Sequence, residues 1–226
     1  IMTVVVRFPD ADPETNSVDG GAASWNAYGN TWDQAHDSGG DQATIASDHV
    51  LSDCMIRAFS QTNKYDLWRR ALIVFNSPGL SVGDTITAVT VQWINQSVTA
   101  QFSGSITFDT SAPASNTEIA AGDYNSFGGV RQIDSDIALT SLSTGNNNLN
   151  TFTLNATGRG NTPKNAVSKW MWRLASDFDD APVTWAYEVQ DQMRMSTADE
   201  AESGDQRPRI NITYTPAPFT PRVIMF

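Results

Sequence analysis

Apolar and polar residues alternate with a period of two along most of the chain, and helical periodicity hardly appears. Residues 85–94 place Val89, Val91 and Trp93 on one face, and residues 209–214 alternate in the same way. Residues 68–75 are apolar on both faces from Ala71 onward, which favours a strand that is covered on both sides. Further strands are predicted at residues 2–8, 105–109, 151–155, 167–175 and 183–189.

This pattern gives roughly eight to ten short strands separated by Gly, Asn, Ser and Asp turns. We therefore predict an all-β fold, an antiparallel β-sandwich of the jelly-roll type with long loops and apolar terminal strands. Residues 9–41 and 112–136 are predicted to be long loops, and a helical turn is expected near residues 162–166. One main domain is expected at residues 9–215, between a strand or arm at 1–8 and a Pro-rich spacer with a strand or arm at 216–226.

The two ends of the chain are unusually apolar. Residues 216–221 include three prolines, which stiffen a spacer, and residues 222–226 then present apolar groups on both faces of a further strand. An unpaired apolar strand aggregates, so these strands are expected to pair with neighbouring subunits or with each other, and both alternatives stay open. The predicted assembly residues are Val223, Ile224, Met225, Phe226, Met2, Val4 and Val6.

Charge and composition exclude several classes of protein. The net charge of −11 argues against a nucleic-acid partner, because binding a phosphate backbone requires clustered Lys and Arg. No run approaches the roughly 20 apolar residues of a membrane span, so no membrane insertion is predicted. Cys54 is the only cysteine, and its apolar neighbours predict that it packs in the core.

No catalytic residues are predicted. His36 and His49 are the only histidines, and no Gly-x-Ser-x-Gly motif occurs, so neither a metal hydrolase nor a nucleophilic triad is indicated. The one cofactor considered is a structural calcium ion, and the alternative is that the same aspartates only form turns. The candidate ligand sets are Asp10, Asp12 and Glu14, or Asp177, Asp179 and Asp180.

Aromatic residues in the first long loop are candidates for sugar binding. Trp25, Tyr28 and Trp32 follow one another at short spacing and are hypothesised to be exposed stacking platforms. The alternative is that they attach the loop to the sheet. Trp170, Trp172 and Trp185 follow strand alternation and are predicted to lie in the core.

Several segments resemble those of DNRLRE-type jelly-roll domains. The resemblance rests on residues 69–91 (RRALIVFNSPGLSVGDTITAVTV) and on the closing run at residues 196–214. Residues 8–20, 114–124 and 152–158 are similar to a branch of the family found in bacteriophage and metagenomic structural proteins. Asn76 stands where the family usually has Asp.

The resemblance implies a non-enzymatic virion protein, either a capsid decoration (cement) protein or a tail-associated protein. Its expected partners are its own subunits and other virion proteins, and its expected location is the virion, after assembly in the host cytoplasm. The family also includes sugar-binding modules attached to polysaccharide-degrading enzymes. A carbohydrate-binding module, with a host-surface glycan as ligand, is therefore the alternative function.

Overall fold

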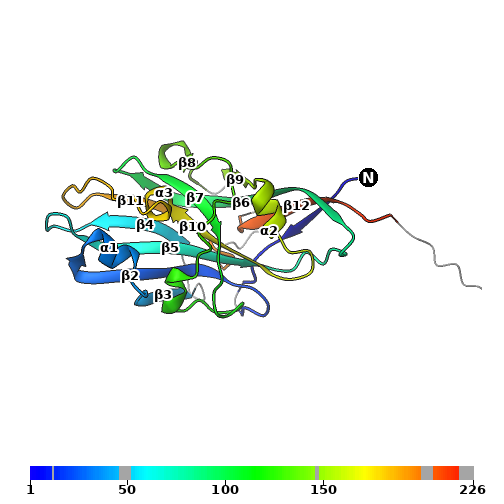
Figure 1. Ribbon diagram of the computed structural model, residues 1–226, viewed down its shortest axis with the longest axis horizontal. Coiled ribbons are helices and arrows are strands. Elements are labelled where there is room, and N and C mark those ends of the chain that lie inside the picture. The colour runs from blue at the N-terminus through cyan, green and yellow to red at the C-terminus, as the bar shows by residue number, and fades with distance from the viewer. Residues whose placement is uncertain (12, 46–51, 146–147, 200–205, 219–226) are drawn as a thin grey trace, which may run out of the picture.

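The computed structural model of the chain describes residues 1–11, 13–45, 52–145, 148–199 and 206–218, and its regular structure is dominated by strands (Figure 1). The strands are β1 (Thr3–Arg7), β2 (Asp19–Asn30), β3 (Gln42–Ile45), β4 (Ser52–Ala58), β5 (Tyr65–Phe75), β6 (Thr85–Ala100), β7 (Ser105–Thr110), β8 (Ile137–Ala138), β9 (Leu149–Thr153), β10 (Ser168–Leu174), β11 (Gln190–Met195) and β12 (Arg209–Thr215). The short helices are α1 (Trp32–His36), η2 (Ala121–Asn125), η3 (Leu139–Ser141), α2 (Ala156–Asn161) and α3 (Ala175–Phe178). No helix in these ranges is long and apolar enough to cross a membrane.

The strands form one curled antiparallel sheet whose two halves face each other. β5 is central to one half, because β2 pairs along one of its edges while β4 and then β10 pair along the other. β6 joins the halves: residues 85–94 pair with β12 and β9, and residues 95–100 pair with β11. The predicted all-β, antiparallel sandwich of the jelly-roll type is confirmed.

Aromatic side chains from the two halves meet in the core. The ring centroids of Trp93 and Trp172 lie 6.0 Å apart, and those of Phe108 and Phe152 lie 5.4 Å apart. These four side chains are at most 1% exposed, and Trp170 stacks on Phe108 at 5.3 Å. Complete burial of a Phe side chain contributes about 1.5–3 kcal/mol, so this cluster is a large part of what joins the two halves.

The opposite face of β5 carries Arg70, which holds the loops on that side. Arg70 is fully buried, and its Nη1 and Nη2 donate to the carbonyl oxygens of Tyr124 (2.9 Å) and His36 (3.1 Å). Its Nε and Nη2 also donate to both carboxylate oxygens of Asp177, at 2.9 and 2.6 Å. Arg173 adds a third donor to Asp177 at 2.9 Å. One guanidinium therefore fixes α1, η2 and α3 over the sheet.

The predicted strand at residues 183–189 is wrong, because this segment is irregular. Its alternation reflects loop residues that touch the sheet edge: Trp185 Nε1 donates to the carbonyl of Phe59 (3.1 Å), and the Tyr65 hydroxyl donates to that of Val183 (2.8 Å). Trp185 is half-buried rather than in the core, and Tyr187 is 61% exposed. The strand at this place in the sheet is β11, which begins after the segment.

Two further predictions of local structure are wrong. Residues 9–41 were expected to be a loop but contain β2, whose first six residues, Asp-Gly-Gly-Ala-Ala-Ser, are buried beside β5. Such small residues have low strand propensity, so the sequence does not indicate this strand. The helical turn expected near residues 162–166 lies earlier, at α2, where the Asn155 side chain caps the helix by accepting from Gly158 N at 2.9 Å. Residues 112–136 contain no strand, as expected.

Replacing Arg70 with leucine is expected to lower the free energy of unfolding by about 3–5 kcal/mol, because it leaves a buried carboxylate with too few donors. Arg57 provides a matched control, since it also binds an aspartate, Asp66, at 2.7 Å but has a 37% exposed side chain. The Arg57→Leu variant should lose less than about 1 kcal/mol. Urea titration followed by tryptophan fluorescence measures both changes, and equal losses would contradict the role given to Arg70.

Candidate functional site

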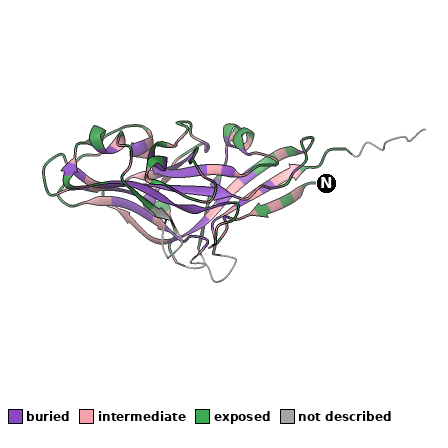
Figure 2. Cartoon of the chain, turned by 90° about the horizontal axis from the view of Figure 1, so that it is seen from below, coloured by how far each residue is buried: buried purple, intermediate pink, exposed green. Residues whose placement is uncertain are grey.

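Strand β1 lies at a margin of the sheet and has an apolar outer face. Among the described strands it pairs only with β12, so no described strand covers its second edge, which we call the open edge. Met2, Val4 and Val6 are 70%, 58% and 37% exposed. Figure 2 shows exposed positions along the strand next to the N-terminus. The β12 residues opposite Val4 and Val6 are polar. The apolar stripe is therefore confined to the open edge of the sheet, and the predicted opening strand is confirmed.

The predicted C-terminal assembly strand, with Val223, Ile224, Met225 and Phe226, lies outside the described residues. The chain just before it is fixed, because Ala217 N donates to Asp84 Oδ1 at 2.9 Å in the turn that precedes β6. β6 and β1 lie on opposite sides of β12. After β12, the chain therefore lies on the β6 side of β12, away from the open edge of β1.

The three aromatic residues proposed for sugar stacking do not share one environment. Trp25 and Tyr28 lie on β2 and are 43% and 80% exposed. Trp32 begins α1 and is 5% exposed, with its ring 4.5 Å from that of Trp68 and its Nε1 donating to Asp180 Oδ1 at 2.8 Å. The prediction of an exposed platform is wrong for Trp32, because its indole attaches α1 to the sheet.

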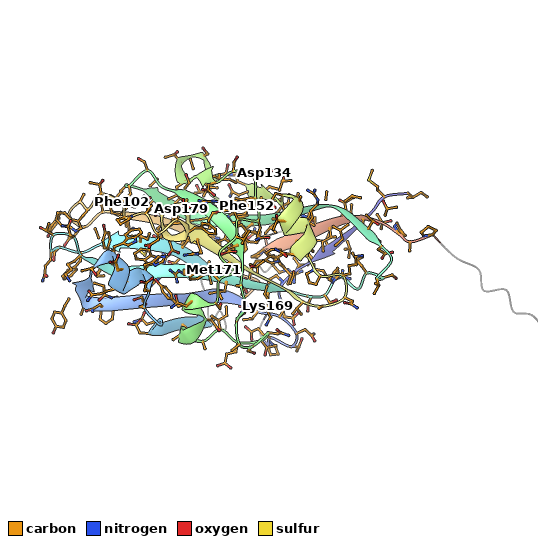
Figure 3. The ribbon with its side chains drawn as sticks, in the orientation of Figure 1. Phe102, Asp134, Phe152, Lys169, Met171 and Asp179 are labelled. Atoms are coloured by element: carbon orange, nitrogen blue, oxygen red, sulfur yellow. The ribbon has the colours of Figure 1, made fainter. Side chains whose placement is uncertain are left out.

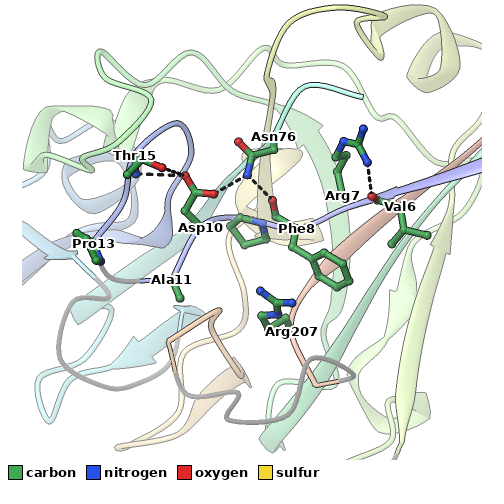
Figure 4. Close-up of a pocket in the computed structure, with 10 residues that line it drawn as sticks. Val6, Arg7, Phe8, Asp10, Ala11, Pro13, Thr15, Asn76 and Arg207 are labelled. Carbon is green, nitrogen blue, oxygen red and sulfur yellow. Dashed lines mark hydrogen bonds between the residues drawn. The ribbon is translucent and has the colours of Figure 1, made fainter. Parts of the chain in front are cut away.

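Asp10 organises a turn beside a pocket at the end of β1 (Figure 4). Its Oδ2 accepts from the amides of Thr15 and Asn16 (3.2 and 2.7 Å), and its Oδ1 accepts from Asn76 Nδ2 (2.6 Å). Burial raises the pKa of Asp10, but the hydrogen bonds from Asn76, Asn16 and Thr15 outweigh burial and leave the pKa below its ordinary value. Asp10 thus binds donors of its own chain, whereas Asp12 lies outside the described residues.

The sequence neighbours Asp177, Asp179 and Asp180 bind three different partners. Asp177 is fully buried between Arg70 and Arg173; burial raises its pKa, but the two guanidinium groups outweigh burial and hold it far below its ordinary value. Asp179 pairs with Arg131 at 2.7 Å, and Asp180 accepts from Trp32. Asp179, labelled in Figure 3, lies at the C-terminal cap of α3. Asp177 and Asp179 therefore bind arginines and Asp180 binds an indole, and the second calcium hypothesis finds no support in this geometry.

Asp19, at the start of β2, has a carboxylate with an unusual environment. It is 2% exposed, and its Oδ2 accepts from Ala198 N at 2.9 Å, while its buried Oδ1 has no hydrogen-bond partner. Burial raises its pKa to about 8; the Ala198 amide opposes this, and the charges of Asp199 and Glu14 add to it. Because residue 199 is far from residues 14 and 19 in the sequence, no spacing motif indicates that its charge reaches Asp19.

Within the described ranges, no three His, Cys, Asp or Glu side chains form a preassembled group that could hold a metal ion. Comparison of the chain with protein-family models and with curated proteins finds no match. The resemblance to DNRLRE-type domains therefore stays a prediction.

The raised pKa of Asp19 predicts how stability depends on pH. Since the pKa is about 8 in the folded chain and ordinarily 3.8, the free energy of unfolding should fall as pH rises between these values. Asp19→Asn removes this titration. The free energy of unfolding of the variant should therefore rise relative to that of the parent chain, by up to about 1.4 kcal/mol for each pH unit over that range. Urea titrations in EDTA at about pH 5, 6.5 and 8 measure the difference.

Asp134→Asn is the matched control, because Asp134 is exposed and its variant should follow the parent chain at every pH. If the Asp19→Asn curve stays parallel to that of the parent chain, the pKa of Asp19 is not raised.

Proposed function

We propose that this chain is a non-enzymatic structural protein of a bacteriophage virion, a capsid decoration or tail-associated protein that assembles through strand β1. The observation that carries the assembly role is the open edge of β1 together with its exposed apolar stripe. Natural edge strands are usually protected by charges, prolines or a covering segment. Residues 3–6 (TVVV) contain no charged residue or proline. The virion location is supported by the resemblance of residues 8–20, 114–124 and 152–158 to phage structural proteins.

The stripe alone gives too little free energy for a stable assembly. Complete burial of a Val or Met side chain contributes about 1.5–3 kcal/mol, and association costs at least about 4 kcal/mol before side-chain ordering. A strand added to the open edge contributes main-chain hydrogen bonds as well. The contact we propose is therefore strand addition, with the apolar stripe packed beneath a neighbour.

The strand that we assign to this edge is the segment at residues 222–226 of a second copy. Its apolar sequence, RVIMF, suits an added strand, and the Ala217–Asp84 hydrogen bond directs the chain away from its own β1. Exchange of identical segments between copies gives a symmetric homo-oligomer or an extended array. Other virion proteins with an apolar strand would fit the same edge.

Removing residues 219–226 while keeping the Ala217 anchor is expected to abolish self-association without unfolding the domain. Val4→Lys should have the same effect, because an exposed edge position tolerates lysine but an added strand would bury its charge. Multi-angle light scattering and sedimentation velocity measure the assembly state. Val130→Lys, at an apolar position that is 51% exposed and distant from β1 in the sequence, should leave it unchanged.

An assembly that survives both the truncation and Val4→Lys would exclude the role given to β1. The virion location has a separate test, mass spectrometry of purified particles from the source of the sequence. Absence of the chain from particles whose other structural proteins are detected would contradict it, whatever the assembly state in solution.

A second candidate function, glycan binding, is favoured by the exposure of Trp25 and Tyr28 on β2. Under this hypothesis, Trp25→Ala and Tyr28→Ala should each weaken binding on a glycan array about tenfold or more, since stacking on an aromatic ring supplies much of such binding. Tyr187→Ala is the control, because Tyr187 is exposed in the irregular segment before β11 rather than on β2. Circular dichroism verifies that each variant is folded, and absence of binding by the parent chain would count against the function.

A further inference from the structure

The buried carboxylate of Asp19 lacks a compensating partner. One oxygen is used by the Ala198 amide, and the other, Oδ1, is sealed from solvent without a hydrogen bond. Two other deeply buried aspartates bind donors with both oxygens: Asp177 binds two arginines, and Asp191 binds the amides of Phe102 and Gly104. A buried polar oxygen without a partner is rare in native proteins and calls for a specific explanation.

Further oxygen atoms without partners belong to the segments that surround Asp19. Glu14, in the loop that leads into β2, has a buried Oε1 without a hydrogen-bond partner. Thr197, two residues beyond the end of β11, is fully buried, and its Oγ1 also has no partner. The Ala198–Asp19 hydrogen bond places the Thr197 segment against the start of β2. Negative charge from Glu14 and Asp199 reaches Asp19, so the environment attracts a cation.

We propose that Asp19 and Glu14 bind a calcium ion between the loop that enters β2 and the segment that follows β11. The evidence is the buried Oδ1 of Asp19 and the buried Oε1 of Glu14, in the loop that leads into β2, neither of which has a hydrogen-bond partner. Calcium accepts six to eight oxygen ligands, including hydroxyl groups, main-chain carbonyls and water. Two carboxylates therefore suffice as its charged ligands, and no preassembled group of three acidic side chains is required.

This site differs from both sets of aspartates expected from sequence spacing. It keeps Glu14 but replaces Asp10, whose oxygens bind the turn, with Asp19 from the adjacent strand. Its function would be to join two segments that are distant in the sequence, because a bound divalent ion neutralises a carboxylate that is otherwise costly to bury in its charged form.

Calorimetric titration of the EDTA-stripped full chain with calcium chloride at about pH 8 tests the proposal. We expect one calcium ion per chain, a rise in Tm on binding, and weaker binding of magnesium, which prefers smaller octahedral sites. Asp19→Asn and Glu14→Gln should each weaken calcium binding at least about tenfold, since each removes one charged ligand. Asp134→Asn should bind calcium as the parent chain does.

The variants also separate loss of the ion from loss of the fold. Without calcium, Asp19→Asn should be at least as stable as the parent chain at about pH 8, because it removes a buried carboxylate that lacks a partner. A parent chain that shows neither binding heat nor a change in Tm at millimolar calcium would overturn the proposal. Binding of equal strength by the parent chain and Asp19→Asn would also overturn it, because the ion would then be held elsewhere.

Discussion

The guanidinium of Arg70 is the group on which the arrangement of the long loops depends. Irregular loops carry main-chain polar groups that need partners once they are buried. Arg70 binds the carbonyls of His36 and Tyr124, and Asp177 balances its charge. This leaves the other face of β5 to the aromatic core, so one strand is covered on both faces by different means. The two candidate recognition surfaces are β1 and the part of β2 that carries Trp25 and Tyr28.

The strands that the sequence predicts well are those whose burial is produced by apolar side chains. β5 and β6 are of this kind, and residues 68–75 and 85–94 lie within them. β11 is not predicted from the sequence, because its residues, QDQMRM, are mostly polar. Asp191 and Gln192 are nevertheless buried. Their polar groups are satisfied inside the protein, Asp191 by two main-chain amides and Gln192 by Asp53 at 2.9 Å. The hydrophobic pattern of a sequence does not reveal residues whose burial depends on hydrogen bonds that form only in the folded protein.

The carboxylates illustrate the same limit for sites. Asp177, Asp179 and Asp180 are neighbours in the sequence, yet their side chains, on α3 and the turn after it, bind different partners. Asp19 interacts electrostatically with Asp199, which no spacing rule would associate with it. Long-range contact through the sheet, rather than local sequence, decides which charges meet. The apolar alternation of Met2, Val4 and Val6 predicts β1 as a strand, but the pairing of β1 with β12 is again a contact between distant parts of the sequence.

The distribution of charge bears on how copies of this chain meet. All 25 acidic residues lie between Asp10 and Asp205, whereas the charged residues of 1–9 and 206–226 are all arginine. Copies with a net charge of −11 repel one another once their surfaces approach within the Debye length, about 8 Å at physiological salt. Contact through β1 and β12, which contain no carboxylate, meets the least repulsion.

The positive charge of Arg7 does not provide an attraction between copies, because its guanidinium donates to the carbonyls of Ser77 and Pro78 at 2.7 and 2.9 Å. Charge therefore acts at this margin by disfavouring other orientations, such as contacts through the exposed aspartates of α1 and the loop after it. In the proposed assembly, apolar contact and main-chain pairing would provide the attraction, at the edge of β1 that no described strand covers.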